Sequence, residues 1–442
     1  MTHTSRVGPV RGSRRAVFVG VALVAAALAG ACTESIDGGD NCAIAAPLCP
    51  GQQLEIRDTI IDPILAYDST YAGFPGRGIE PYLALVSSGN DLETVAILRF
   101  DTLITHYVPP DDTAYAITYV DSVFVRLWVD LTGSQVPDSV RIDLYDVNDT
   151  TAADSADSPL VARFAPQFLI GGATFAKAKI VDSVFVPVSD SAMLAALADS
   201  STGWQRLRVG VRVSGPGPVA FRIGAVEGGL PAELRYRPRP DSGTPLLEIP
   251  LASAGPVGRE DIRLDLLDYS VVTKNNLPTI ANTMLLGGVP GRRAYLRFDI
   301  PRWLSDSSTI VRATLRLTQV AYPFGGPLDT VVVHPRVGLA SFEITDLRRA
   351  STLIAGPGVV ISDSLSVVPG ESGVRELEMF SLVRAWGSQA GIPGVPPRAL
   401  VLTVSEEGTL PRLAAFWSSS AGAGLRPAMR ITYTRNSGFG VP

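Results

Sequence analysis

The stretch "RAYLRFDI" at residues 293–300 decides the fold, because "VAILRFDT" at residues 95–102 repeats it. The aspartates of the two phrases are 198 positions apart (299 − 101). Every second residue in each phrase is apolar, which places the apolar side chains on one face of a strand and the polar ones on the other. The repeat predicts one half-buried strand built twice, with Phe100 and Phe298 in two cores and the arginines and aspartates facing outward.

Other segments recur in the same order. "SVFVRLWVDL" (122–131) corresponds to "ATLRLTQV" (313–320), and "GGLPAELRY" (228–236) corresponds to "AGLRPAMRITY" (423–433). The offset drifts between these pairs, as insertions in loops between fixed strands would cause. The sequence therefore predicts a tandem duplication, with its seam in the proline- and glycine-rich "RPRPDSGTP" (237–245).

The fold class follows from short alternating runs separated by turn clusters such as "GSQVPD" and "SGPGP". Such runs favour antiparallel sandwiches over a parallel α/β sheet. We predict an all-β protein with two tandem antiparallel β-sandwich, jelly-roll-like domains at residues 53–240 and 246–436. Short helices are expected at 190–200 and 379–388, which are equivalent places in the two copies.

Composition excludes some functions. Hydrophobic residues make up 46% of the chain and charged residues 18%, which is typical of a folded globular protein. Lysine occurs at three positions, so 35 of the 38 basic residues are arginine (38 − 3). The arginines alternate with acids and form no basic block, and we therefore expect no nucleic-acid partner.

The N-terminus has the pattern of a secretory signal peptide. Four arginines precede the apolar run "AVFVGVALVAAALAGA" (16–31), which ends at Cys32. The segment "LAGAC" resembles a bacterial lipobox, which implies a signal peptide at 1–31, a lipidated Cys32 and a tether at 32–52. Because Thr33 and not aspartate follows the cysteine, the same resemblance implies export to the cell envelope and anchoring in the outer membrane. The alternative is an ordinary signal peptide with Cys32 unmodified.

Two further cysteines, Cys42 and Cys49, lie close together in "DNCAIAAPLCP". Outside the cytoplasm such a pair favours a local disulfide at the start of the tether. The alternative is two free thiols. A zinc site is not expected, because no second pair and no nearby histidine completes four ligands.

The second copy resembles the DNRLRE-type, carbohydrate-binding-module-like domain of secreted and surface bacterial proteins. The blocks that carry the resemblance are "AYLRFD" (294–299), "ATLRL" (313–317), "LVRAWGS" (382–388) and "RPAMRITY" (426–433). The first copy keeps "ILRFD" but has "VRLWV" in the second block. The resemblance implies a jelly-roll β-sandwich with a binding or structural role at the cell surface, and it implies no catalytic residues.

The search for chemistry finds no catalytic motif. The mature chain has His106 and His334, no G-x-S-x-G elbow, and nothing in the sequence that places a serine beside either histidine. Acidic pairs such as Glu406 and Glu407 are expected to be solvated turn residues. We predict no cofactor. Calcium has one weak candidate site at Asp146, Asn148 and Asp149, since hard cations take oxygen ligands.

Aromatic residues are the remaining candidates for binding, because sugars stack on exposed rings. Trp128 shares its strand face with Arg126 and not with Leu127, and Trp417 lies beside a serine run. The alternative is that a loop or the other domain covers the Trp128 ring. We predict a lipid-anchored surface protein with two non-catalytic modules that bind polysaccharide or a cell-surface protein, or act as structural spacers. The alternative is a secreted carbohydrate-active enzyme, or its accessory subunit, with an acidic cleft.

Overall fold

The computed structural model describes residues 56–61, 68–101, 103–107, 114–148, 157–199, 205–238, 249–252, 267–298, 300–301, 303–304, 308–322, 330–338, 354, 363–388 and 399–435. Their regular secondary structure is mostly antiparallel strand with a few short helices, which confirms the predicted all-β sandwich class. Residues 56–442 form one compact unit. The predicted lipidation site Cys32 and the cysteines Cys42 and Cys49 lie outside the described residues.

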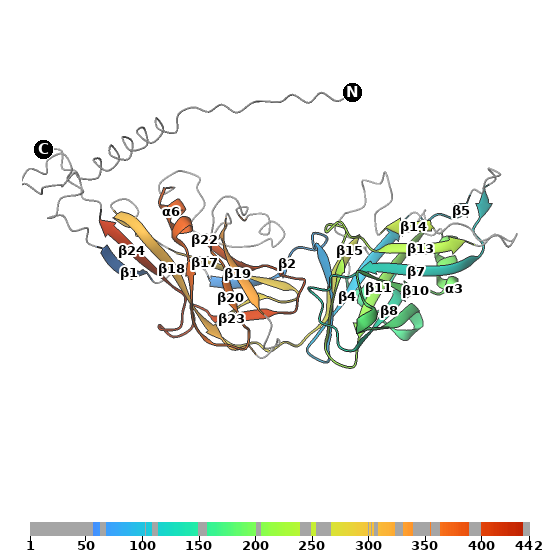
Figure 1. The fold of residues 1–442 in the computed structure, drawn as a ribbon, viewed down its shortest axis with the longest axis horizontal. Coiled ribbons are helices and arrows are strands. Elements are labelled where there is room, and N and C mark those ends of the chain that lie inside the picture. Colours follow the sequence, from blue (N-terminus) through green and yellow to red (C-terminus); the bar gives the residue numbers. More distant parts are fainter. Residues whose placement is uncertain are drawn as a thin grey trace, which may run out of the picture. The chain divides into compact units, whose positions relative to one another are not determined.

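The first sandwich contains two facing sheets (Figure 1). In the described residues, the 4-stranded sheet has the order β10 (Ser183–Pro187), β7 (Val120–Trp128), β13 (Glu233–Pro238) and β14 (Ile249–Ala252). The 7-stranded sheet has the order β12 (Val219–Gly224), β3 (Tyr82–Ser88), β4 (Leu92–Asp101), β11 (Arg206–Ser214), β8 (Ser139–Asp146) and β9 (Leu169–Ala176), with β15 (Asp268–Asn275) also paired to β4. A separate hairpin joins β5 (His106–Tyr107) and β6 (Tyr115–Ala116).

The second sandwich is one curled sheet, 11-stranded in the described residues. Its order is β1 (Ile56–Ile61), β24 (Ala428–Arg435), β18 (Ser308–Val320), β23 (Leu413–Trp417), β16 (Thr283–Gly287), β17 (Gly291–Arg297), β22 (Ala399–Val404), β19 (Val331–Gly338) and β20 (Leu365–Val367). In addition, β2 (Asp68–Phe74) pairs with β17 and β21 (Gly373–Glu378) pairs with β18.

The helices are short. The described ones are α2 (Asp157–Val161), α3 (Asp190–Ala198) and α6 (Phe380–Ser388), with 3-10 turns η2 (Pro166–Phe168) and η3 (Lys177–Lys179). The predicted helices at 190–200 and 379–388 correspond to α3 and α6. Ser189 is the N-cap of α3, and its side chain accepts a hydrogen bond from the Ala192 backbone N–H. Among the described residues, no helix has both the length and the apolar character needed to cross a membrane.

The repeated phrase forms one wall of each core. Phe100 is fully buried with Leu98 in the core of the first sandwich, and Phe298 is 1% exposed in the core of the second. The prediction that both phenylalanines are core residues is confirmed. The polar side of the phrase differs from the prediction: Arg99 and Asp101 are both buried, and Arg99 Nε donates to Asp101 Oδ2 at 2.6 Å.

The outer face of β4 is buried because a second apolar cluster covers it. Val95 and Ile97 of β4 pack there with Leu160 of α2 and with Tyr269 of β15, and Phe164 packs against the same cluster. Alternation within β4 correctly separates two faces, but both faces lie inside the protein. A buried ion pair therefore replaces the solvated arginine and aspartate that the sequence predicts.

Strand pairing does not follow the predicted domain boundaries. β1 and β2 belong to the first copy but pair with β24 and β17 of the second sandwich (Figure 1). β14 and β15 belong to the second copy but pair with β13 and β4 of the first sandwich. The strands on either side of the predicted seam at 237–245, β13 and β14, therefore both belong to the first sandwich. That sandwich spans residues 82–275, and the second combines residues 56–74 with 283–435.

The exchanged strands occupy equivalent places. Ser270 of β15 lies opposite Ala96, and Thr70 of β2 lies opposite Ala294, at the same position of the repeated phrase. The β3–β4 ladder covers Val86 to Ser88, and β15 pairs with β4 from Leu92 to Leu98. Each copy thus contributes its first two strands to the sandwich built from the other copy.

Candidate binding face on the first sandwich

The outward face of β7 carries the predicted stacking residue Trp128. On β7, Val123, Val125 and Leu127 are buried in the core, with exposed fractions of 2%, 0% and 0%. The intervening residues, Arg126 and Trp128 among them, are half-buried on the opposite face. The prediction that Trp128 shares its face with Arg126 is confirmed.

Neighbouring strands bring further side chains to this face. On β10, Phe185 lies opposite Arg126 in the ladder, while the flanking Val184 and Val186 are buried. On β13, Glu233 lies opposite Arg126, and Arg235 lies opposite Phe124 of β7. We call the resulting surface the aromatic–arginine face, which consists of Phe124, Arg126, Trp128, Phe185, Glu233 and Arg235.

Guanidinium groups lie over the rings of this face. The Cζ atom of Arg126 is 3.5 Å from the centroid of the Trp128 ring and 5.6 Å from that of Phe185. The Cζ atom of Arg235 is 5.8 Å from the Phe185 centroid. A cation at this distance from an aromatic face is attracted by the ring quadrupole. The rings and guanidinium groups therefore hold one another in fixed orientations.

One carboxylate joins the two arginines. Arg235 Nη2 lies 2.6 Å from Glu233 Oε2, and Arg126 Nη1 lies 3.6 Å from the same oxygen. Glu233 thus contacts Arg235 on its own strand, β13, and Arg126 on the neighbouring strand, β7. Donors, an acceptor and aromatic rings are the groups that recognise a sugar, because they supply hydrogen bonds to hydroxyls and a stacking surface for C–H groups.

Phe185 has the most exposed ring of the face, at 44%. Sequence reasoning missed it and proposed Trp128 instead, although one side of Trp128 is covered by Arg126. The missed signal is the alternation in "SVFVP", where two valines that face the core flank the phenylalanine. The parity argument that placed Trp128 outward applies equally to Phe185.

The second sandwich has no rings at the equivalent positions of its described strands. Thr318 of β18 occupies the place of Trp128, and Glu376 of β21 occupies the place of Phe185 opposite Arg316. Arg316 Nε lies 3.6 Å from Glu376 Oε1. The duplicated strands therefore carry an ion pair where the first sandwich carries an aromatic stack, which provides a matched control within the chain.

The other predicted stacking residue, Trp417, is not part of this surface. It is half-buried at the end of β23, opposite Thr283 of β16. Trp128 and Trp417 lie in different sheets, and the structure does not bring them together.

The calcium candidates make hydrogen bonds within the protein. Asn148 N–H donates to Asp146 Oδ1 at 2.9 Å, and Arg206 Nε donates to Asn148 Oδ1 at 2.6 Å. Burial raises the pKa of Asp146. The third candidate, Asp149, lies outside the described residues. In the described residues no group of three or more histidine, cysteine or acidic side chains has a metal-binding arrangement.

The structure places a serine beside His334, which sequence reasoning did not foresee. His334 Nε2 lies 2.7 Å from Ser405 Oγ. Burial, and to a smaller extent the positive charge of Arg336, lowers the pKa of His334. Within the described residues, no carboxylate is hydrogen-bonded to this histidine. The arrangement is a serine–histidine pair without the third group that orients a catalytic base.

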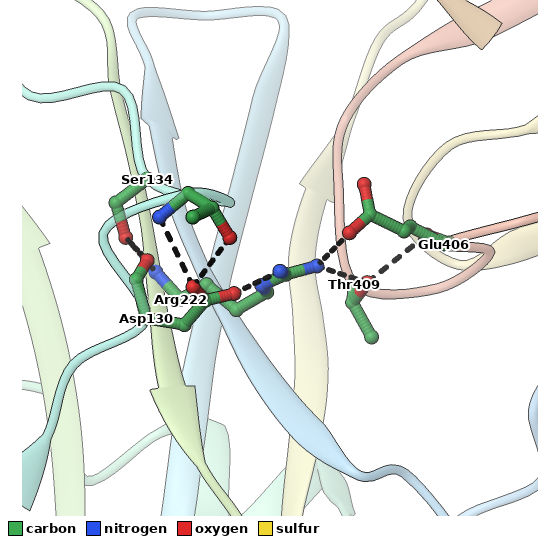
Figure 2. Close-up of polar contacts among 6 residues, drawn as sticks. Asp130, Ser134, Arg222, Glu406 and Thr409 are labelled. Carbon is green, nitrogen blue, oxygen red and sulfur yellow. Dashed lines mark hydrogen bonds and ion pairs between the residues drawn. The ribbon is translucent and has the colours of Figure 1, made fainter. Parts of the chain in front are cut away.

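The acidic turn "SEEG" also differs from the prediction of solvated carboxylates. Arg222 of β12 contacts Asp130 through Nη2, and its Nη1 donates to Glu406 Oε1 at 2.8 Å and to Thr409 Oγ1 at 3.4 Å (Figure 2). Glu407 accepts from Arg293 Nε at 2.8 Å. The turn therefore links strands of both sandwiches through ion pairs.

Comparisons with known proteins add little. No protein-family model and no curated protein matches the chain. A weak match to the C-terminal domain of the Streptococcus pyogenes antigen I/II-family protein AspA has 10% identity, a TM-score of 0.14, and coverage of 87% of this chain and 92% of that chain. The VP2 subviral particle of infectious bursal disease virus gives 8% identity, a TM-score of 0.11 and coverage of 87% and 77%. Likenesses this weak carry no argument, and the resemblance to DNRLRE-type domains stays a prediction.

Proposed function

We propose that the protein is a lipid-anchored, non-catalytic surface protein whose first sandwich binds glycan through the aromatic–arginine face. The observation that carries this proposal is the set of rings and guanidinium groups on adjacent strands, with Phe185 open to solvent. The signal peptide pattern and Cys32 support export and attachment to the envelope.

The face has the properties of a preformed glycan site. Its rings lie on strands of one sheet and not on loops, so little ordering is needed before binding. The charged groups are partly paired with one another, with exposed side-chain fractions of 17% for Arg126 and 27% for Arg235. Such groups offer hydrogen bonds to hydroxyls without the full cost of desolvating an isolated charge.

The function of the second sandwich is proposed to be structural. Its equivalent strands carry Thr318 and the Arg316–Glu376 ion pair where the first sandwich has rings. It also contains β1, the first described strand after the predicted tether. We propose that this sandwich connects the lipid anchor to the binding module.

A glycan array probed with residues 53–436 tests the proposal. We expect the wild type to bind a set of polysaccharides, and Phe185→Ala and Trp128→Ala to lose at least about tenfold in affinity for them. Thr318→Ala, at the place of Trp128 in the second sandwich, should bind like the wild type. Binding that both aromatic variants retain, or no binding by a folded wild-type protein, would contradict the proposal.

A further inference from the structure

A pair of buried carboxyl groups lies at the entry to the first sandwich. Glu80 precedes β3 and is 8% exposed, and Asp268 begins the exchanged strand β15 and is 1% exposed. The exposed Glu227, in the turn after β12, is close enough to affect both electrostatically. None of the ion pairs in the described part of the chain involves these three carboxyl groups.

Hydrogen bonds of backbone N–H groups join the segments that carry Glu80, Glu227 and Asp268, and we call this region the corner. Val226 N–H donates to Asp268 Oδ2 at 2.9 Å, and Ile79 N–H donates to Glu80 Oε2 at 3.1 Å. Ala225 N–H donates to the Pro81 carbonyl at 3.3 Å. A Cβ atom at Gly228 would lie 2.2 Å from that carbonyl, so the close approach of the turn requires glycine. Asp268 Oδ1 is buried and has no hydrogen-bond partner.

The cations near this corner are engaged elsewhere. Arg77 pairs with Asp157 and lies over the Tyr269 ring, and Arg99 pairs with Asp101. From β4, the residue opposite Asp268 is the apolar Leu98. Among the described residues, no ion pair therefore brings a positive charge to Glu80 or Asp268.

We propose that Glu80 and Asp268 form a proton-dependent clasp, which in its protonated form fastens the turn after β12 and the start of β15 to the entry of the first sandwich. When both groups ionise, two like charges remain in a buried corner with one unsatisfied oxygen, and the corner loosens. The clasp does not depend on glycan binding. It makes the attachment of the exchanged strand β15 sensitive to the pH outside the cell.

The burial of Glu80 and Asp268 also affects their pKa values. Burial, with a smaller contribution from neighbouring carboxylates and against backbone hydrogen bonds that lower it, raises the pKa of Glu80 from 4.5 to about 7 and that of Asp268 from 3.8 to about 7. Because these values exceed those of the unfolded chain, the folded protein binds more protons than the unfolded chain between about pH 4 and pH 7. The stabilisation is complete below that window and is lost as the pH rises through it.

Urea unfolding of residues 53–436 between pH 5 and pH 8 tests the clasp. Relative to Asp268→Asn, the folding equilibrium constant of the wild type should fall by roughly tenfold or more across this range. Glu80→Gln should flatten the pH dependence in the same way. Asp91→Asn removes an exposed carboxylate from the β3–β4 turn and should follow the wild type. If the ratio of the wild-type folding equilibrium constant to that of Asp268→Asn does not change with pH, the proposal is overturned.

Hydrogen exchange on the wild type gives a second readout if neither variant folds. After correction for intrinsic rates, peptides covering 225–230 and 267–271 should lose protection by several-fold between pH 6 and pH 8. Peptides from β18, in the second sandwich, should not. Equal behaviour of the two sets of peptides would also overturn the clasp.

Discussion

At the scale of single residues, the repeated phenylalanine explains why the two copies share one phrase. Phe100 and Phe298 are 0% and 1% exposed, and each lies in the main core of its sandwich. Deletion of a buried ring removes its transfer free energy and leaves a cavity that the surrounding strands fill only in part. The phrase is thus a structural wall in both copies.

The first prediction concerns these rings. Phe100→Ala and Phe298→Ala should each lower the free energy of unfolding by about 3–5 kcal/mol. Urea or thermal unfolding measured by circular dichroism provides the comparison with the wild type. A Phe298→Ala protein as stable as the wild type would show that this residue does not support the core.

The second prediction concerns the buried ion pair of the same phrase. Arg99 and Asp101 have exposed side-chain fractions of 2% and 0%. Arg99→Ala leaves Asp101 without its guanidinium partner in a buried site, and we expect it to cost about 3–5 kcal/mol of unfolding free energy. Calorimetric unfolding checks the value. A cost below about 1 kcal/mol, as for an exposed pair, would refute the buried assignment.

At the scale of elements, the turn between β22 and β23 connects the two sandwiches. Glu406 reaches Arg222 of β12, and Glu407 contacts Arg293 of β17. The two glutamates are adjacent but differ in exposure, with 45% for the Glu406 side chain and 12% for that of Glu407. Arg222 also has Asp130 as a second partner.

This difference gives the third prediction. Glu407→Ala leaves the buried Arg293 without its carboxylate and should cost about 3 kcal/mol. Glu406→Ala removes a half-exposed partner from an arginine that retains Asp130, and should cost less than about 1 kcal/mol. Thermal unfolding of the two variants, prepared side by side, measures the contrast. Equal losses would contradict the assigned contacts.

Much of the local structure was predictable from the sequence. Alternation identified the buried and exposed faces of β7, and helical stretches corresponded to α3 and α6. The burial of Arg99 was not predictable, because it depends on α2 and Phe164, which are remote in sequence from β4. Of the aromatic–arginine face, parity identified Trp128, and the same rule would have identified Phe185. The pairing of Arg126 with Glu233 required the strand register.

At the scale of the whole molecule, sequence patterns could not predict that the two copies exchange strands. β2 and β15 are equivalent strands, and each pairs with a strand that contains the repeated phrase. Backbone hydrogen bonds are the same whichever copy supplies the strand, so alternation does not show which of the two similar partners is chosen. The duplication predicts a domain boundary at 237–245, but β14, which follows this stretch, pairs with β13 of the first sandwich.

The strand exchange determines which sandwich follows the proposed anchor. The predicted tether leads to β1, which pairs with β24 in the second sandwich. The first sandwich is inserted between β2 and β16, so the aromatic–arginine face belongs to a module that follows β1 and β2 in the chain.

The fourth prediction concerns the anchor itself. The wild type should partition into detergent and be labelled by palmitate, because the segment before Cys32 resembles a lipobox. Cys32→Ala should show neither behaviour, and its precursor should accumulate unprocessed. Labelling of Cys32→Ala at the wild-type level would exclude this anchor.

The strand pairing makes residues 82–275 a complete sandwich, whereas residues 53–240 lack two of its strands. Urea unfolding of these two fragments tests this difference. We expect 82–275, which contains β14 and β15, to unfold in one cooperative transition with a β-type spectrum. Fragment 53–240 lacks those strands and carries β1 and β2 without their partners, so it should show no cooperative transition. A cooperative 53–240 fragment together with an unfolded 82–275 fragment would contradict the exchange.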